Sequence, residues 1–221
     1  MLLKAEEIDD LCFKKDMRKE RKPGFKLGIT GGIGSGKTSV CKVFNVLGIP
    51  FFSADPEASE IMDNDKSIIR GINSITGKEL YTNGTLNRKE LATLIFNDNS
   101  LLKRVNSLVH PVVLDHFRKW ELQQDAPYVI LEAAILFESG ASKLVDRIAT
   151  VVAPVEERVE RVIRRNNISR ELVMERMHNQ MDDDSRIKLS DYVIHNSENE
   201  MIIPAVLKIH EELLKIINTV N

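Results

Sequence analysis

A glycine-rich segment between an apolar run and an amphipathic run constrains this chain more than any other feature. Residues 31–38 read GGIGSGKT and match the pattern G-x-x-x-x-G-K-[ST]. Phe25–Thr30 before them is typical of a strand, and after them residues 37–47 place apolar side chains at helical spacing. Strand, loop and helix in this order form a phosphate-binding loop, so we interpret residues 31–38, the phosphate loop, as a site for a nucleoside triphosphate.

Each residue type in the phosphate loop has a chemical reason. Glycines let the backbone curl so that successive N–H groups face phosphate oxygens, and the helix N-terminus adds partial positive charge. Lys37 is expected to bind the β and γ phosphates of ATP, and the Thr38 hydroxyl is expected to bind Mg²⁺. The predicted nucleotide-binding residues here are Gly32, Ile33, Gly34, Ser35, Gly36, Lys37, Thr38 and Ser39.

Apolar runs along the chain predict an α/β fold. Beside Phe25–Thr30, strands are expected at residues 50–53, 128–131, 148–152 and 192–194. Helical patterns separate them, which favours a five-stranded parallel sheet with helices on both faces, similar to P-loop nucleotide kinases. We expect a charged N-terminal extension at residues 1–23 and a kinase domain at 24–221. Within that domain we expect a helical acceptor-binding region near 56–125 and a lid near 158–190.

Composition excludes several classes of protein. Apolar residues make up 43% and charged residues 29%, and the net charge is −2, so an ordinary globular protein is expected rather than one that coats nucleic acid. No apolar run is long enough to span a membrane, and acidic residues near the start argue against a secretion signal. Cys12 and Cys41 are expected to be inert thiols. We expect a cytoplasmic protein that is a monomer or a weak homo-oligomer.

Three classes of nucleotide-binding protein compete for this sequence. GTPase switches need N-K-x-D and usually D-x-x-G, and neither occurs here. Motor or remodelling ATPases need an acidic residue at the end of an apolar strand, and Glu132 could serve. Small-molecule kinases often have a carboxylate after the second strand and an arginine-rich segment that closes over ATP, and this chain has both features. The kinase class is therefore favoured.

The carboxylate after the second strand is Asp55. Ligands of parallel α/β sheets bind beyond the carboxyl ends of the strands, so Asp55 is expected to face the γ-phosphate. There it could accept a proton from an acceptor hydroxyl or hold Mg²⁺ through water. The alternative is helix capping by Asp55, with Pro56 at the first helical position. We favour a functional carboxylate, which could also cap.

Four arginines recur at three- and four-residue intervals on one predicted helix. For Arg158 and Arg164 we expect a solvated face paired with neighbouring glutamates. For Arg161 and Arg165 we expect a role in a lid, where an arginine neutralises charge on the transferring phosphoryl group and helps exclude water.

The chain from about Phe25 to Ile217 resembles dephospho-CoA kinases, which phosphorylate the ribose 3′-hydroxyl of dephospho-CoA with ATP to give coenzyme A. The resemblance lies in L-G-I-T-G-G-I-G-S-G-K-T, in Leu47–Pro50 followed by Ala54-Asp55, and in residues 131–138, which resemble D-x-P-L-L-F-E. It implies catalytic roles for Asp55, Lys37 and Arg161, ATP contact by Arg165, Mg²⁺ as cofactor, and dephospho-CoA as partner substrate.

Further segments extend the resemblance. Gly84–Arg88 and Leu108–Pro111 resemble the family's helical acceptor domain, and Gln180, Arg186 and residues 191–196 resemble the segment near the adenine end of ATP. We interpret His110 as a structural hydrogen-bonding residue. Among nearby basic residues, we expect Arg88 to meet the acceptor's phosphates.

Overall fold

The computed structural model describes residues 24–96 and 98–220, so the expected N-terminal extension lies outside the described residues. The central sheet contains the strands β1 (Phe25–Thr30), β2 (Phe51–Ser53), β5 (Tyr128–Glu132), β6 (Arg147–Val152) and β7 (Tyr192–His195). A two-stranded hairpin contains β3 (Tyr81–Thr82) and β4 (Thr85–Leu86). The helices are α2 (Lys37–Val46), α3 (Ala54–Asn64), α4 (Lys66–Thr76), α5 (Arg88–Phe96), α6 (Asn99–Glu121), η1 (Ala141–Leu144), α7 (Val155–Asn166), α8 (Arg170–His178), α9 (Asp183–Lys188) and α10 (Ile202–Val220).

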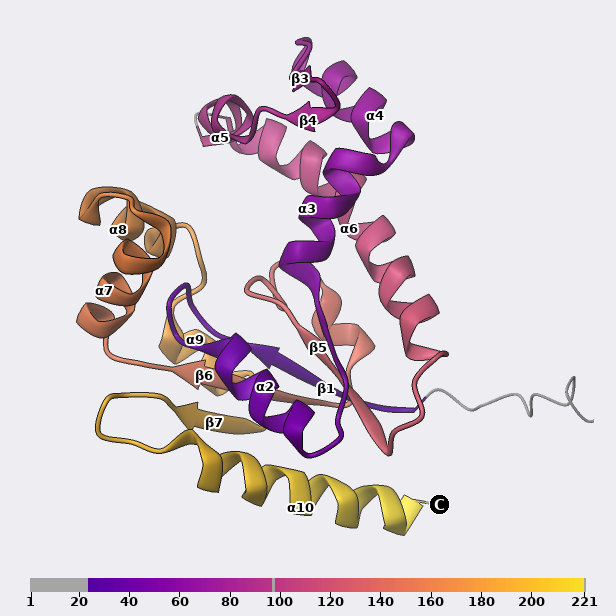
Figure 1. Cartoon of the computed structure of the whole chain (residues 1–221), viewed down its shortest axis with the longest axis vertical. Coiled ribbons are helices and arrows are strands. Elements are labelled where there is room, and N and C mark those ends of the chain that lie inside the picture. Colours follow the sequence, from indigo (N-terminus) through magenta and orange to yellow (C-terminus); the bar gives the residue numbers. More distant parts are fainter. Residues whose placement is uncertain (1–23, 97, 221) are drawn as a thin grey trace, which may run out of the picture.

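The five main strands form one parallel sheet in the order β2-β5-β1-β6-β7 (Figure 1). Every neighbouring pair in this sheet is parallel. All five residues of β5 are buried, which explains its continuous apolar sequence: both faces of the strand are covered. The predicted five-stranded parallel sheet is therefore confirmed, as are its strand positions to within a residue or two.

Helices cover both faces of the sheet with two separate cores. One core joins α2 and α10 to one face, where side chains such as Phe44 and Leu213 pack against Leu27 and Ile130. The other core packs the helices α3, α4, α5 and α6 against the opposite face of the sheet. There Phe52 and Leu131 of the sheet belong to the same core as three helix residues, Ile61, Val109 and Phe117. Phe52 and Phe117 meet edge to face with ring centroids 5.5 Å apart, which fixes β2 against α6.

The helical region α3–α6 rises above the sheet in Figure 1. It contains the short hairpin β3–β4, which sequence periodicity did not predict because each strand has only two residues. Asn83 and Gly84 connect the strands with φ of 51° and 79°, as a two-residue hairpin turn requires. Helix α6 continues through Pro111 and supplies the long support of this region.

Helices α7 and α8 form a small separate unit at the side of the sheet where β6 ends (Figure 1). Their core consists of Val159, Val162 and Val173, and Ile33 of the phosphate loop packs against it. The unit therefore contacts the phosphate loop directly. None of the described helices combines the length and apolarity needed to cross a bilayer.

Candidate active site

The sheet aligns three chain segments at one edge. Ser53 at the end of β2 and Ile29 near the end of β1 both pair in register with Glu132 at the end of β5. Because these strands are parallel, the segments that follow them leave the sheet side by side. The phosphate loop follows β1 and Asp55 follows β2, so residues distant in sequence meet at this edge.

The phosphate loop has the backbone that its glycines predict. Gly34 and Gly36 have φ of 78° and 94°, a region that favours glycine, and Gly36 precedes the first residue of α2. Space is equally restrictive, because a Cβ atom at Gly34 would lie 2.5 Å from the carbonyl oxygen of Arg158. A Cβ atom at Gly32 would collide with the Arg158 guanidinium. The loop therefore excludes a side chain at Gly34, and a side chain at Gly32 would have to displace the Arg158 guanidinium.

Lys37 lies folded within the loop and is buried. Its Nζ donates to the carbonyl oxygen of Gly31 at 3.0 Å. Burial lowers the pKa of Lys37, and the carboxylates of Asp55 and Glu132 oppose that shift. The ammonium group is thus only partly compensated by protein groups, which makes it suited to bind an anion in the loop.

Glu132 joins the loop to the second strand. Its Oε1 accepts a hydrogen bond from the Thr38 hydroxyl at 3.3 Å, and its Oε2 accepts one from the Ser53 hydroxyl at 2.6 Å. The side chain is buried. The sequence suggested a role for Glu132 only in the rival ATPase class. Glu132 is therefore a site residue that the kinase interpretation missed. Its position at the end of an apolar strand was the available signal.

Asp55 lies on α3 one residue after the helix begins, and Ser53 occupies the N-cap position. The capping interpretation of Asp55 is therefore wrong: β2 runs directly into α3, so the helix starts earlier than Pro56 suggests. The side chain faces a cleft that is open to solvent. Even so, loss of hydration raises the pKa of Asp55, while Lys37 lowers it and Glu132 raises it.

A pocket with about 1210 Å³ of atom-free space, part of it open to solvent, surrounds this cleft. It brings together most of the predicted site residues: Ile33, Gly34, Gly36, Lys37, Thr38, Ser39, Asp55, Arg161 and Arg165. Gly32 and Ser35 do not line it, because both are buried within the loop. Glu132 and Gln180 also line the pocket.

The four arginines of α7 differ in burial: Arg161 is partly buried, Arg164 and Arg165 are exposed, and Arg158 is buried. Arg161 donates to Glu157 at 2.6 Å and to the carbonyl oxygen of Asn196 at 3.0 Å, and its Nη1 is buried with no partner among the described residues. Arg165 is exposed at the pocket wall. Arg164 is exposed, as expected for a solvated residue.

Arg158 contradicts the solvated interpretation, because it is only 4% exposed. Its Nε donates to the carbonyl oxygen of Ile33 at 3.0 Å, and its Nη1 donates to Asp183 at 2.7 Å. Asp183 also accepts from Arg186, which is 1% exposed, at 2.9 Å. Through these hydrogen bonds Arg158 connects α7 and α9 to the phosphate loop.

Two more polar side chains hold the loop from the C-terminal part of the chain. Gln180 accepts a hydrogen bond from the Ile33 amide at 2.8 Å, and Asn196 donates to the Ser35 carbonyl oxygen at 2.7 Å. The sequence resemblance had associated Gln180 and Arg186 with the adenine end of ATP. The structure places Gln180 against the loop itself and Arg186 in the cluster that supports it.

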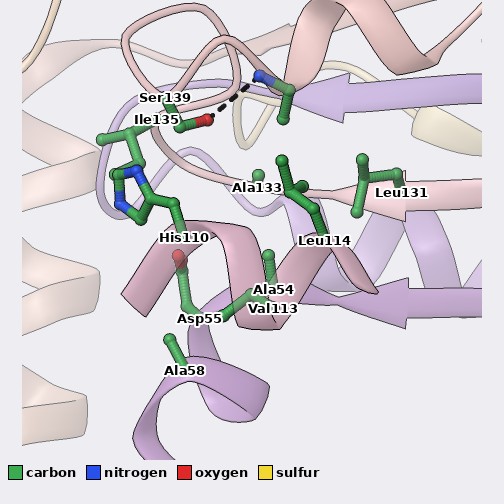
Figure 2. A pocket seen from close by; sticks show the side chains of 11 residues that line it. Ala54, Asp55, Ala58, His110, Val113, Leu114, Leu131, Ala133, Ile135 and Ser139 are labelled. Carbon is green, nitrogen blue, oxygen red and sulfur yellow. Dashed lines mark hydrogen bonds between the residues drawn. The ribbon is translucent and has the colours of Figure 1, made fainter. Parts of the chain in front are cut away.

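Asp55 also lines a second pocket (Figure 2). Helix α3 and helix α6 form one side of it, and the segment after β5 forms the other. His110 of α6 lines it close to Asp55 (Figure 2). Arg88 pairs with Asp63 at 2.8 Å and with the Ser59 hydroxyl at 2.7 Å, and its expected contact with the acceptor's phosphates stays a prediction.

Comparison with known proteins identifies the family. The family model described as dephospho-CoA kinase matches residues 25–201. The chain belongs to the dephospho-CoA kinase family. A dephospho-CoA kinase of Bacteroides fragilis is 40% identical over 185 residues, which cover 83% of this chain and 90% of that protein. One of Porphyromonas gingivalis is 36% identical over 186 residues, covering 84% and 92%.

Solved structures agree with this dephospho-CoA kinase assignment. A dephospho-CoA kinase from Campylobacter jejuni superposes with a TM-score of 0.60 at 25% identity, covering 86% of this chain and 97% of that one. The protein TT1252 from Thermus thermophilus superposes with a TM-score of 0.77 at 32% identity, covering 86% and 98%. The family resemblance and the P-loop kinase fold expected from the sequence are thus confirmed, and the chain is an ATP-dependent kinase.

Proposed function

We propose that this protein transfers the γ-phosphate of ATP to the 3′-hydroxyl of the ribose of dephospho-CoA, giving coenzyme A and ADP. Family membership supports the donor, the acceptor and the reaction. The observation that carries the assignment of the site is the position of Asp55, which lines both the phosphate-loop pocket and the second pocket. An acceptor in one pocket and a triphosphate in the other would meet at this carboxylate.

The proposed chemistry is an in-line displacement. The acceptor oxygen forms a bond to the γ-phosphorus, the bond from that phosphorus to the bridging oxygen of ADP breaks, and the hydroxyl proton passes to Asp55. Lys37 and Arg161 stabilise the negative charge of the phosphoryl group during transfer. The Nη1 of Arg161 is buried and has no hydrogen-bond partner in residues 24–96 and 98–220, which supports this role because a phosphate oxygen would give it an acceptor.

Arg165 and the phosphate loop complete the proposed ATP site. Gly34, Gly36, Lys37 and Thr38, which line the pocket, contact the phosphates, and Arg165 neutralises charge from the open side of the pocket. Arg161 and Arg165 share one helix, so a small movement of the α7–α8 unit would bring both toward ATP together.

The donor atoms at this edge of the sheet fit Mg²⁺. The Thr38 hydroxyl, the Glu132 carboxylate and the Asp55 carboxylate are hard oxygen ligands of the kind that magnesium prefers. Thr38 and Glu132 would hold the ion, directly or through water, and Asp55 would orient a bound water. When bound with ATP, magnesium neutralises charge on the β and γ phosphates.

The proposal is tested by incubating the protein with ATP, Mg²⁺ and dephospho-CoA and detecting coenzyme A by mass. Labelled ATP offered with a panel of other alcohols, including a nucleoside and a sugar acid, measures selectivity. Formation of coenzyme A with the highest kcat/KM of the panel supports the proposal. Absence of transfer to dephospho-CoA, with transfer to another alcohol, would refute it.

A further inference from the structure

One hydrogen bond joins the phosphate loop to the segment between α8 and α9. The Ile33 amide N–H donates to Oε1 of Gln180 at 2.8 Å. Because an N–H group needs an acceptor, this bond fixes which end of the Gln180 carboxamide faces the loop. The oxygen points to Ile33, and the amide nitrogen Nε2 points away from it. Nε2 is therefore the polar atom of this side chain that is left for a ligand.

The nitrogen end of this carboxamide has no protein partner. No hydrogen bond joins Nε2 to another residue in 24–96 or 98–220, and Nε2 is not among the buried polar atoms of these segments that lack a partner. It is therefore accessible. Gln180 is half-buried and lines the phosphate-loop pocket together with Gly34, Lys37 and Arg161. An accessible N–H donor at the wall of this pocket is suited to bind a phosphate oxygen.

The backbone around Gln180 is held on both sides. Its own N–H donates to the Met177 carbonyl oxygen at 3.2 Å, and the Met181 N–H donates to Glu138 at 3.1 Å. Ile33 is fixed from the same direction, because its side chain packs against the core of the α7–α8 unit. The carboxamide is thus positioned before ATP binds. Donors that need no reorganisation stabilise a transition state most effectively.

The place of Ile33 in the loop indicates which phosphate Nε2 contacts. The lysine of such a loop binds the β and γ phosphates. Here Nζ of Lys37 lies at the start of the loop, 3.0 Å from the carbonyl oxygen of Gly31 and 3.5 Å from that of Gly32. Ile33 is the next residue along the chain. Gln180 is therefore held at the end of the loop that lies nearest to the lysine ammonium and the γ-phosphate.

We propose that Gln180 is a further catalytic residue, which keeps Oε1 on the Ile33 N–H and donates from Nε2 to an oxygen of the γ-phosphoryl group during transfer. The inference rests on the proposed function for transfer from ATP, but not for the identity of the acceptor alcohol. Gln180 adds a neutral donor to the positive charges of Lys37 and Arg161 in the same pocket. The donor stabilises the charge that the phosphoryl oxygens carry in the transition state.

The variant Gln180→Glu separates the two ends of the carboxamide. It keeps the length of the side chain and an oxygen that accepts from Ile33, but it replaces the donor with a negative charge. We expect kcat to fall about 10²-fold or more, a loss typical of removing one donor to a transition-state oxyanion. If Gln180 only positioned the loop through Ile33, the variant would keep kcat within about twofold of the wild type, and that result would overturn the proposal.

The variant Gln180→Met removes donor and acceptor together at nearly the same size. It is expected to lower Tm by about 2–4 °C through loss of the Ile33 contact, whereas Gln180→Glu leaves Tm within about 1 °C. An equal decrease in Tm for both variants would refute the hold on Ile33. The matched control is Gln123→Glu, which makes the same change of charge at an exposed position outside the pocket. Its kcat and Tm are expected to match the wild type.

The pH dependence of kcat gives a readout that a role in loop positioning would not move. When the new carboxyl group of Gln180→Glu is protonated, its O–H becomes a donor again. The ratio of the variant's kcat to the wild-type kcat is therefore expected to rise about threefold or more between about pH 8 and about pH 6. Taking the ratio removes the titration of Asp55, which both proteins share. A ratio that does not change with pH would contradict the donor role.

Nucleotide binding tests the contact without any turnover. Calorimetry compares ADP with a non-hydrolysable ATP analogue, each with Mg²⁺. Because only the analogue carries a γ-phosphate, Gln180→Glu is expected to raise the Kd of the analogue about tenfold and the Kd of ADP by less than about twofold. Equal losses for the two nucleotides would show that Gln180 acts only through the loop, against the proposal.

This measurement also distinguishes a failure of the inference from a failure of the proposed function. If the wild-type protein forms no coenzyme A but Gln180→Glu weakens the ATP analogue selectively, the contact by Gln180 holds and the proposed acceptor is wrong. If coenzyme A forms and the variant retains the wild-type kcat, the proposed function holds and the role of Gln180 is wrong.

Discussion

Replacing Arg158 with methionine is expected to destabilise the folded protein by about 3 kcal/mol. The change removes a hydrogen bond to the Ile33 carbonyl, worth about 1 kcal/mol, and a charge-assisted bond to Asp183, worth about 2 kcal/mol. Removing one partner of a fully buried ion pair costs about 3–5 kcal/mol, but the Asp183 side chain is 29% exposed and regains some water. The lower end of that range therefore applies.

For a chain of 221 residues, this loss corresponds to a decrease in Tm of about 6–12 °C. Urea unfolding gives the free energy directly, and Arg164→Met, an exposed position on the same helix, is the control with an expected change below about 0.5 kcal/mol. A double-mutant cycle with Asp183→Asn is expected to give a coupling of about 1–3 kcal/mol. A loss below about 1 kcal/mol for Arg158→Met, or no coupling, would refute the view that Arg158 ties α7 to the phosphate loop.

Three further substitutions test the catalytic groups. Lys37→Ala is expected to keep the fold and lose most turnover, as seen by coenzyme A formation beside a melting curve. Asp55→Asn is expected to lower kcat by about 10² or more. Loss of hydration in the cleft raises the pKa of Asp55, and only its ionised form accepts a proton. The value of kcat/KM should therefore fall with decreasing pH earlier than for an ordinary aspartate, and Asp55→Asn should abolish this acid limb. Glu132→Gln is expected to raise the Mg²⁺ concentration needed for half-maximal rate, and an unchanged Mg²⁺ titration would contradict the proposed ligand set.

The sequence predicted those parts of the fold and site that depend on neighbouring residues. The phosphate loop needs glycines at fixed offsets, and positive φ at Gly34 and Gly36 makes those offsets visible in sequence. The apolar run of β5 indicates a strand covered on both faces, which is the environment that the structure gives it. Because the carboxyl ends of parallel strands meet at one edge of the sheet, the sequence alone predicts that Asp55 lies near the loop.

The residues that the sequence placed wrongly or missed depend on packing between distant segments. Arg158 lies on a helix with glutamates nearby, and a charged helix of this kind is usually solvated. Its burial depends on the phosphate loop and on Asp183 of α9, which cover that helix face. Helical spacing gives the face on which a residue lies, but it does not give what packs on that face.

The division of the site between two parts of the chain has a consequence for specificity. The groups proposed to bind ATP and Mg²⁺ come from the phosphate loop, β5 and α7, whereas α3 and α6 build the pocket proposed for the acceptor. Asp55 belongs to both, because α3 starts directly from β2 at the sheet edge. Substitutions on α3 and α6 that spare Asp55 can therefore change which alcohol is phosphorylated while leaving the KM for ATP intact. Substitutions at Arg158 or Gln180 act through the loop and should affect ATP with every acceptor alike.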